Sequence, residues 1–257
     1  MQPYFFPYAG YFELIASTDR WVVFDTVKYN RRSWMTRNRI LGPRLGWQYV
    51  GVPVRRMVSG TPVHAITVVD KRAALGRLLA QLAHYRRAAP CYRQVTRLVE
   101  EGFARSASER LVDLNVGTQA AVCEYLQIPF RWQLCSESGF DLGAVEHPGQ
   151  WALRICESMK AQAYVNPPGG VDLFRTEEWT RAGIALEFLE VTPLRYACPP
   201  YRFEPRLSIL DALMWLHPDA VRAQWQRRVR PPRQESRDPA GGPGPPHAAG
   251  AVPGAPH

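Results

Sequence analysis

Residues 148–170 read PGQWALRICESMKAQAYVNPPGG and contain, in succession, a helix, a strand and a glycine-rich loop. Pro148 suits the first turn of a helix, where proline loses no helical hydrogen bond. Apolar residues then recur at helical spacing, at Ala152, Ile155, Cys156 and Met159. The apolar run 163–165 is typical of a short buried strand, and prolines and glycines follow it. A helix that leads directly into a buried strand indicates an α/β fold.

The same alternation extends in both directions from this stretch. Apolar runs and alternating patterns predict strands at residues 21–24, 47–54, 63–68, 128–134 and 184–191. Apolar stripes predict helices at residues 10–17, 72–85, 92–103, 106–126 and 208–216 and from residue 219 onward. The patterns Ser106-x-x-Glu109 and Ser208-x-x-Asp211 are typical of helix starts. We therefore predict a single α/β domain over residues 1–229, with a largely parallel sheet flanked by helices.

Residues 230–257 differ in composition from the rest of the chain. Proline, glycine and alanine dominate, and no apolar periodicity is present. Such a segment buries too little apolar surface to offset the entropy lost on ordering. We predict a disordered tail, in which His247 and His257 form no metal site.

Cysteine content and hydropathy indicate the cellular compartment in which the protein is expected. The five cysteines are Cys91, Cys123, Cys135, Cys156 and Cys198, with none at Cys-x-x-Cys spacing. An odd number without that spacing favours free thiols in a reducing compartment over disulfides or a zinc site. No run approaches the roughly 20 apolar residues of a membrane span, and the N-terminus lacks the basic region of a signal peptide. A cytoplasmic location without a membrane span is expected.

The net charge of +9 favours an anionic ligand or partner, or else reflects arginine-rich coding alone. A cluster of Arg31, Arg32, Arg37 and Arg39 lies in a loop-like segment with Trp34 and Asn38. Guanidinium groups suit phosphate or carboxylate, and a solvated basic loop is the alternative. One Trp among four Arg without a recognisable binding module does not indicate nucleic acid, so no such partner is expected.

Asp25 directly follows the apolar run 21–24. In parallel sheets, ligands bind beyond the carboxyl ends of the strands, which directs attention to residues 25–38 and 166–170. We predict that Asp25 is catalytic, as a general base or as the group that orients a substrate amine. Capping of a turn at the end of a strand is the alternative.

The opening stretch from Gln2 to Phe12, QPYFFPYAGYF, resembles the signature of the WbqC-like family. Further similar stretches follow in the family's order at residues 19–25, 34–40, 85–90, 155–156, 164–166 with 169–170, and 203–211. The resemblance extends from residue 2 to about residue 225. Thr26, Lys28 and Thr36 depart from the residues usual in the family. Members usually carry a short strand before the Gln-Pro, so either a longer N-terminus or a lost strand is expected.

Membership of this family implies a small enzyme that modifies a sugar or a similar metabolite. Family members are associated with gene clusters for O-antigen, other surface polysaccharides and some natural products. The reaction that the resemblance suggests is transfer of an aminoacyl group, such as glycyl, to an amino sugar.

Cys156 matches a cysteine of the family and is the predicted nucleophile, which would accept an acyl group from a carrier thioester. Its place on the apolar stripe of a helix equally suits a small buried hydrophobic residue. A cysteine nucleophile requires a histidine nearby. His84, at the end of a predicted helix, is the predicted catalytic histidine, with His64 and His147 as the other candidates.

The predicted substrate-binding residues come from three parts of the chain: Gln2, Tyr4, Tyr8, Gly10, Trp34, Arg37, Asn38, Asn166, Gly169 and Gly170. The glycines at 169 and 170 either expose backbone N–H groups to an oxyanion or phosphate, or form a tight turn.

The N-terminal aromatic residues form an apolar wall or belong to the core, and core is favoured for Phe5, Phe6 and Phe12. Tyr8-x-Gly10 resembles in layout a nucleotidyltransferase turn, without that turn's histidines.

Three functions follow from these features. The first is acyl or aminoacyl transfer to an amine, with a small-molecule substrate and an acyl-carrier domain as donor. The second is handling of a nucleotide or sugar nucleotide at the first strand-to-helix loop. The third is a non-catalytic assembly protein that binds an acidic carrier domain. No cofactor is identified from the sequence, and no metal site is predicted.

Overall fold

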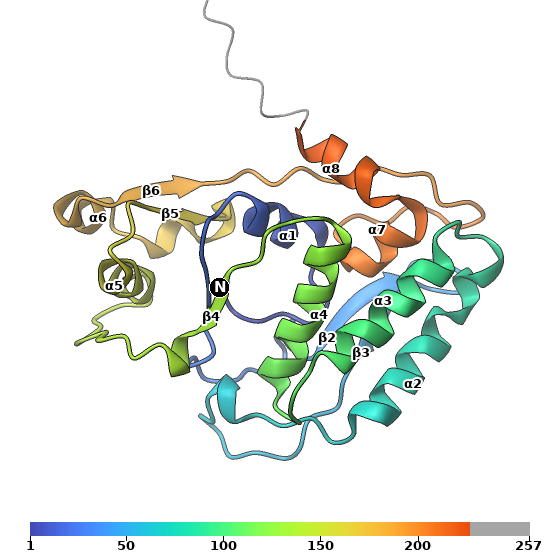
Figure 1. The fold of residues 1–257 in the computed structure, drawn as a ribbon, viewed down its shortest axis with the longest axis horizontal. Coiled ribbons are helices and arrows are strands. Elements are labelled where there is room, and N and C mark those ends of the chain that lie inside the picture. Colours follow the sequence, from blue (N-terminus) through green and yellow to red (C-terminus); the bar gives the residue numbers. More distant parts are fainter. Residues whose placement is uncertain (227–257) are drawn as a thin grey trace, which may run out of the picture.

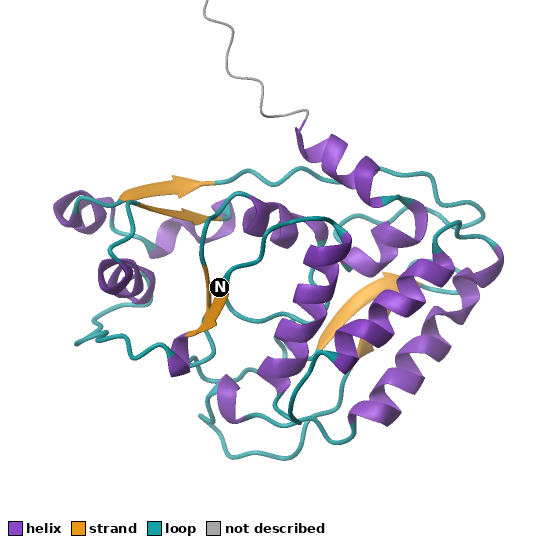
Figure 2. Ribbon diagram, viewed as in Figure 1, coloured by secondary structure: helices purple, strands orange, loops and turns teal. Residues whose placement is uncertain are grey.

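The computed structural model describes residues 1–226, and these residues form an α/β fold (Figure 1, Figure 2). The helices are α1 Ala9–Ala16, α2 Lys71–Leu82, α3 Tyr92–Ala104, α4 Leu111–Tyr125, α5 Gln150–Met159, α6 Thr176–Ala182, α7 Ile209–Trp215 and α8 Pro218–Gln226. The strands are β1 Trp21–Val23, β2 Arg37–Leu41, β3 Trp47–Gly51, β4 Trp132–Leu134, β5 Ala163–Asn166 and β6 Ala185–Phe188. The predicted class is confirmed. The predicted tail, residues 230–257, lies outside the described residues.

The described strands pair as three two-stranded sheets in place of one continuous sheet. β1 with β4 and β5 with β6 are parallel, whereas β2 with β3 is an antiparallel hairpin. Figure 1 shows the three pairs apart from one another, with α2, α3 and α4 gathered near β2 and β3, and α5 and α6 near β5 and β6. Each strand has only three to five residues, so each strand pair is small. Helices and loops therefore fill the space between the pairs.

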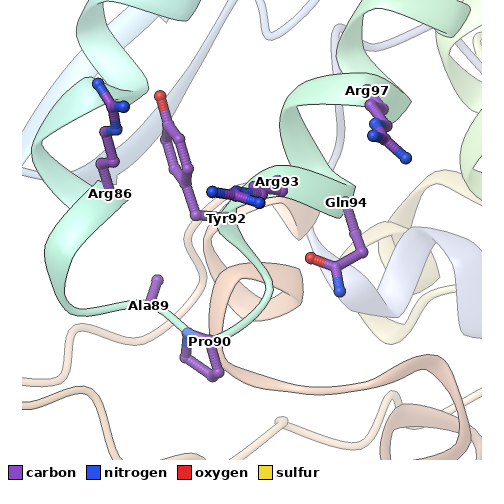
Figure 3. A pocket seen from close by; sticks show the side chains of 7 residues that line it. All are labelled: Arg86, Ala89, Pro90, Tyr92, Arg93, Gln94 and Arg97. Atoms are coloured by element: carbon purple, nitrogen blue, oxygen red, sulfur yellow. The ribbon is translucent and has the colours of Figure 1, made fainter.

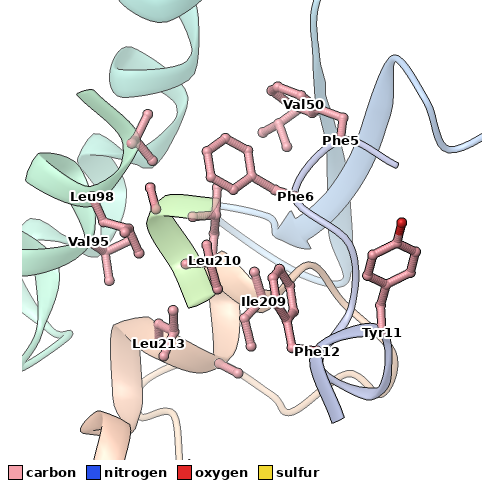
Figure 4. Packing of buried hydrophobic residues seen from close by; sticks show 14 of the residues in the cluster. Phe5, Phe6, Tyr11, Phe12, Val50, Val95, Leu98, Ile209, Leu210 and Leu213 are labelled. Atoms are coloured by element: carbon pink, nitrogen blue, oxygen red, sulfur yellow. The ribbon is translucent and has the colours of Figure 1, made fainter. Parts of the chain in front are cut away.

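The N-terminal aromatic segment enters the main core, as predicted for Phe5, Phe6 and Phe12, which are fully buried. Figure 4 shows these rings against Val50 of β3, residues of α3 and residues of α7. A second, smaller cluster of Leu153, Cys156, Trp179 and Ile184 joins α5 to α6 and the start of β6. The α5–β6 region therefore has a core of its own beside the main one.

Residues 63–65 form a short 3-10 helix, so the strand predicted over residues 63–68 is wrong there. Val63 and Ile66 are both buried, and residues three apart share one side of a 3-10 helix. The apolar pattern suited either structure. Thr67 and Val68 still make isolated bridges, to Arg110 and Val54.

The segment predicted to be loop-like around Arg37 and Arg39 is strand β2, from Arg37 to Leu41. Its pairing with β3 supplies backbone hydrogen bonds that the sequence pattern did not reveal.

The long central helix begins at Leu111 rather than at Ser106. There Val68 N donates to Glu109 O and Leu111 N to Ile66 O, and Arg110 between them is extended. A non-local pairing thus overrides a local capping pattern.

The predicted helix start at Ser208 is confirmed, because its side chain accepts a hydrogen bond from Leu210 N. Asp70 similarly caps α2, accepting from Ala73 N. Within residues 1–226, no helix is both long and apolar enough to cross a membrane.

Candidate functional site

A cavity of about 690 Å³ lies where the N-terminal segment and β1 meet α5 and β5. Its lining includes four of the residues predicted from sequence: Gln2, Tyr4, Cys156 and Asn166. Its volume is in the usual range for small-molecule sites. Aromatic side chains form much of the wall, from Trp21, Phe24, Trp151, Tyr164 and Phe174. Such walls suit the apolar faces of a sugar or an acyl chain.

Buried amides on α4 hold the N-terminal segment at this cavity. Asn115 Nδ2 donates to Pro3 O at 2.8 Å and to Met35 O at 2.9 Å. Gln119 Nε2 donates to Tyr4 O at 2.8 Å. Both amide side chains are fully buried. Their partners are backbone carbonyls, which every residue has, so the sequence does not reveal the pairing, and Asn115 and Gln119 were not predicted as site residues. The presence of two amide side chains within an apolar helix was the one sign of a buried polar role.

Asn38, predicted to bind substrate, is a second anchor of the same segment. Its Nδ2 donates to Phe5 O at 3.1 Å and Phe6 O at 2.9 Å, and Ser208 Oγ also donates to Phe6 O at 2.7 Å. Phe6 has φ of 38°, in the left-handed region that favours glycine. The polar contacts stabilise this turn, which carries Tyr4 to the cavity wall. Asn38 is buried and does not line the cavity.

Cys156 lies in α5 on the cavity wall and is only 6% exposed. Its other neighbours are the apolar side chains of the smaller core. Burial raises the pKa of the thiol to about 11. At neutral pH the sulfur is therefore protonated and keeps its proton until a reacting group accepts it. No histidine of the described residues lines this cavity.

Tyr164 and Asn166 lie next to each other on the wall formed by β5. The Tyr164 hydroxyl donates to Asn166 Oδ1 at 3.1 Å, and Asn166 Nδ2 donates to Pro167 O at 3.0 Å. Burial raises the pKa of Tyr164, so its hydroxyl remains a donor. A Cβ at Gly170 would lie 2.7 Å from Asn166 Nδ2. Gly170 thus leaves the space that the Asn166 side chain fills, while its own N–H donates to Pro167 O. Gly169 does not line the cavity.

The rim of the cavity is charged and exposed. Its ionisable side chains are Asp19, Arg20, Lys160 and Glu187. Carboxylates suit an ammonium group on a ligand, and the cations suit a phosphate or a carboxylate. The cavity thus combines an aromatic interior with charged groups at its entrance.

Asp25 is fully buried just after β1, where it contacts the residues that follow β4. Its two carboxylate oxygens accept from Ser136 N at 2.9 Å and Ser136 Oγ at 2.6 Å. The Asp25 carboxylate thereby ties together the carboxyl ends of the two parallel strands β1 and β4. Asp25 does not line the cavity, and its catalytic role stays a prediction.

His84 lies far along the chain from Cys156 and belongs to another cluster. Its ring packs on Tyr85, with centroids 4.1 Å apart, and burial lowers its pKa. Asp211, fully buried in α7, accepts hydrogen bonds from the Tyr85 hydroxyl, from Tyr196 at 2.6 Å and from Leu41 N at 3.1 Å. Burial raises the pKa of Asp211. A carboxylate inside the apolar run of residues 209–214 was the sequence signal for this cluster.

Tyr8 and Gly10 pack away from the cavity. A Cβ at Gly10 would lie 2.6 Å from the Tyr8 ring and 2.7 Å from Val191 Cβ, so the turn is filled by side chains. Trp34 and Arg37 lie on a different surface, beside or within the β2–β3 hairpin. Of the residues predicted to bind substrate, Tyr8, Gly10, Trp34 and Arg37 are therefore separate from the cavity.

A smaller hollow of about 410 Å³ opens at the start of α3. Figure 3 shows Arg86, Arg93 and Arg97 around it, with Tyr92 between them. It is basic and exposed, and it carries none of the predicted site residues. Over residues 1–226, no three His, Cys, Asp or Glu side chains are grouped so as to hold a metal ion.

Comparison with known proteins places these features in a family context. The model of the WbqC-like protein family matches residues 2–223. An uncharacterized protein of Mycobacterium tuberculosis, Rv1507c, is 26% identical over 216 residues, which cover 83% of this chain and 90% of that protein. No solved structure gave a significant match.

Proposed function

Because this chain belongs to the WbqC-like protein family, we propose that it is a transferase that acylates an amine, with the 690 Å³ cavity as its substrate site. The proposed acceptor is an amino sugar or a related amine of polysaccharide or natural-product biosynthesis. The proposed donor is an acyl or aminoacyl thioester on a carrier domain. The observation that supports this function is the meeting of Cys156 with Gln2, Tyr4 and Asn166 at one cavity.

Different residues of the cavity lining suit different parts of the proposed acceptor. Aromatic rings such as Trp21 and Trp151 suit the apolar face of a sugar ring, and the amides of Gln2 and Asn166 suit its hydroxyl groups. The Glu187 carboxylate at the rim suits the ammonium form of the acceptor. An amine bound there lies at the edge of the chamber that contains the thiol.

Acyl transfer through Cys156 takes two steps. The sulfur attacks the thioester carbonyl, a new C–S bond forms, the bond to the carrier sulfur breaks, and the thiol proton passes to that sulfur. The bound acceptor loses its ammonium proton to bulk water, and the neutral amine then attacks the acyl-cysteine. An amide bond forms, the C–S bond to Cys156 breaks, and a proton from the nitrogen returns to the thiol. With a pKa of about 11, the thiol requires this coupled proton transfer, since little thiolate exists at neutral pH.

Intact-protein mass spectrometry after incubation with aminoacyl thioesters, without acceptor, tests this route. We expect one acyl group per chain in the parent protein and none in Cys156→Ser. Cys135→Ser is the matched control, because Cys135 is also buried but does not line the cavity, and it should still acquire the group. Acylation that persists in Cys156→Ser would remove Cys156 from the mechanism. An amide product formed without any acyl-enzyme would instead indicate direct transfer.

A further inference from the structure

The positive charge of this chain is concentrated in one segment. Residues 26–69 contain eight Lys or Arg and no Asp or Glu. This segment therefore contributes +8 to the net charge of +9, and the other 213 residues contribute +1. In the part of the chain that the structure describes, none of these eight basic side chains forms an ion pair. The charge is thus local and uncompensated.

The β2–β3 hairpin at the centre of this segment presents arginines and aromatic rings on its outer face. Directly paired residues share a face of a hairpin, and Arg39 pairs with Tyr49 while Leu41 pairs with Trp47. The inner face carries Asn38, Ile40 and Val50, which are buried. The outer face therefore combines Arg37, Arg39, Trp47 and Tyr49, with Trp34 packed beside them, while Leu41 at the end of the same face is buried.

The guanidinium groups of this face already lie over the rings. Arg37 is 4.6 Å from the centroid of Tyr49, and Arg39 is 4.9 Å from that of Trp47 and 5.4 Å from that of Trp34. The Nε atoms of both arginines are buried beneath this face and find no acceptor among residues 1–226. The rings remain partly exposed, at 37% for Trp34, 42% for Trp47 and 43% for Tyr49. Cations and amphipathic rings are thus gathered on one partly exposed face.

Exposed aliphatic side chains accompany this array. Leu45, in the turn of the hairpin, is 85% exposed, and Val58, in the loop after β3, is 81% exposed. Soluble surfaces rarely gather large apolar side chains in one region without a partner. The exposed basic residues Arg31, Arg32 and Arg44 lie in the same segment.

We propose that the outer face of the β2–β3 hairpin, with its flanking loops, docks this protein on an anionic lipid membrane surface. Tryptophan and tyrosine favour the headgroup region, aliphatic side chains enter its apolar edge, and basic clusters are attracted to anionic lipids. The association is peripheral and independent of the proposed acyl transfer. It would hold the cavity close to a lipid-borne or membrane-associated substrate.

Nucleic acid suits this face less well. Bases stack on open ring faces, but here guanidinium groups cover the rings, and the rings are tilted to each other by 41° and 75°. The exposed side chains of Leu45 and Val58 would make no favourable contact with a phosphate backbone, whereas they can insert into the apolar edge of a lipid interface.

Vesicle co-sedimentation of the full chain tests the proposal. Phosphatidylcholine vesicles with about 30% phosphatidylglycerol should bind the protein at low salt, and phosphatidylcholine vesicles should not. The variant Arg31→Glu/Arg32→Glu/Arg44→Glu should bind at least tenfold less. The control Arg86→Glu/Arg93→Glu/Arg97→Glu reverses the same number of charges at the hollow of α3 and should bind within twofold of the parent protein. Equal loss in both variants would mean that net charge alone drives binding and would overturn the proposal.

A second measurement does not depend on charge reversal. Brominated anionic lipids should quench tryptophan fluorescence in the parent protein, and Trp47→Phe should reduce that quenching. Trp132→Phe is the matched control, since Trp132 on β4 is 44% exposed but lies outside the segment, and it should leave the quenching unchanged. Absence of quenching, or binding to a single-stranded oligonucleotide without binding to vesicles, would also overturn the proposal. Acyl-enzyme formation in solution should be unaffected by these substitutions, so the two proposals fail separately.

Discussion

The side-chain amide of Gln119, fully buried in α4, donates a hydrogen bond to the backbone carbonyl of Tyr4 at 2.8 Å. The two residues are 115 positions apart in the chain. This bond holds the segment that carries Gln2 and Tyr4 to the cavity wall. The position of that wall therefore depends on a polar contact from a helix that does not line the cavity.

Replacing Gln119 by Ala should lower both stability and substrate affinity. The substitution leaves the partly buried Tyr4 carbonyl without its donor, which costs about 1–3 kcal/mol in the free energy of unfolding. Chemical denaturation measures that change, and KM for the acceptor should rise more than kcat falls. Gln224→Ala is the control, because its side chain bonds an exposed backbone and should change stability by less than about 0.5 kcal/mol. An unchanged free energy of unfolding in Gln119→Ala would contradict the anchoring role.

Alkylation of Cys156 should be slow at neutral pH and should accelerate as the pH rises. Burial raises the pKa of this thiol from an ordinary value of 9.0 to about 11, so about 100-fold less thiolate is present at pH 7. Iodoacetamide labelling, followed by peptide mass spectrometry, should give a rate that rises about tenfold per pH unit toward pH 11. Cys123, fully buried away from the cavity, is the internal control and should stay unlabelled in the folded protein. A rate that levels off below pH 9 would show that the thiol is activated instead.

Asp211 should make the protein less stable as the pH rises. Burial raises its pKa, so the folded state binds this proton more tightly than the unfolded state. Its contribution is complete below the ordinary aspartate pKa of about 4 and is lost as the pH rises through the raised folded-state pKa. The free energy of unfolding should therefore fall with pH over this window in the parent protein and fall less in Asp211→Asn. The exposed Asp172→Asn variant should keep the parent profile.

Asp25→Asn should destabilise the protein by about 1–3 kcal/mol, because both carboxylate oxygens accept hydrogen bonds from Ser136. An amide nitrogen cannot accept the second bond. Thermal unfolding and turnover should be measured on the same preparation, and turnover should be lost even in the folded fraction, as the predicted catalytic role requires. Turnover that merely follows the folded fraction would remove Asp25 from the mechanism and leave it as the link between β1 and β4.

Local patterns predicted most of the helices and the α/β class. The stripe of α5 and the run of β5 were readable because helix and strand periods act over neighbouring residues. The 3-10 helix at Val63 and the late start of α4 at Leu111 were misread. In both places the local pattern was compatible with two structures. Hydrogen bonds to distant residues determined which backbone conformation formed.

Cys156, Asn166, Gln2 and Tyr4 were predicted from the sequence as site residues, and the structure brings these four to one cavity. His84 was selected for its residue type, and its actual neighbours, Tyr85 and Asp211, could not be inferred. A residue type indicates which chemistry is possible. Distance and burial, which set pKa and access, arise only when segments far apart in the chain are packed together.

The amino-acid sequence by itself determined the α/β class, the residues of most helices and the burial of the N-terminal phenylalanines, because these depend on short-range periodicity and on hydrophobicity. Only the tertiary structure decided that Gln2 and Tyr4 lie beside Cys156, that Arg37 belongs to a strand, and that arginines cover the rings of one hairpin face. These relationships depend on backbone pairing within the β2–β3 hairpin and on buried hydrogen bonds between residues more than a hundred positions apart. No local pattern encodes such contacts, since either partner alone is compatible with several environments.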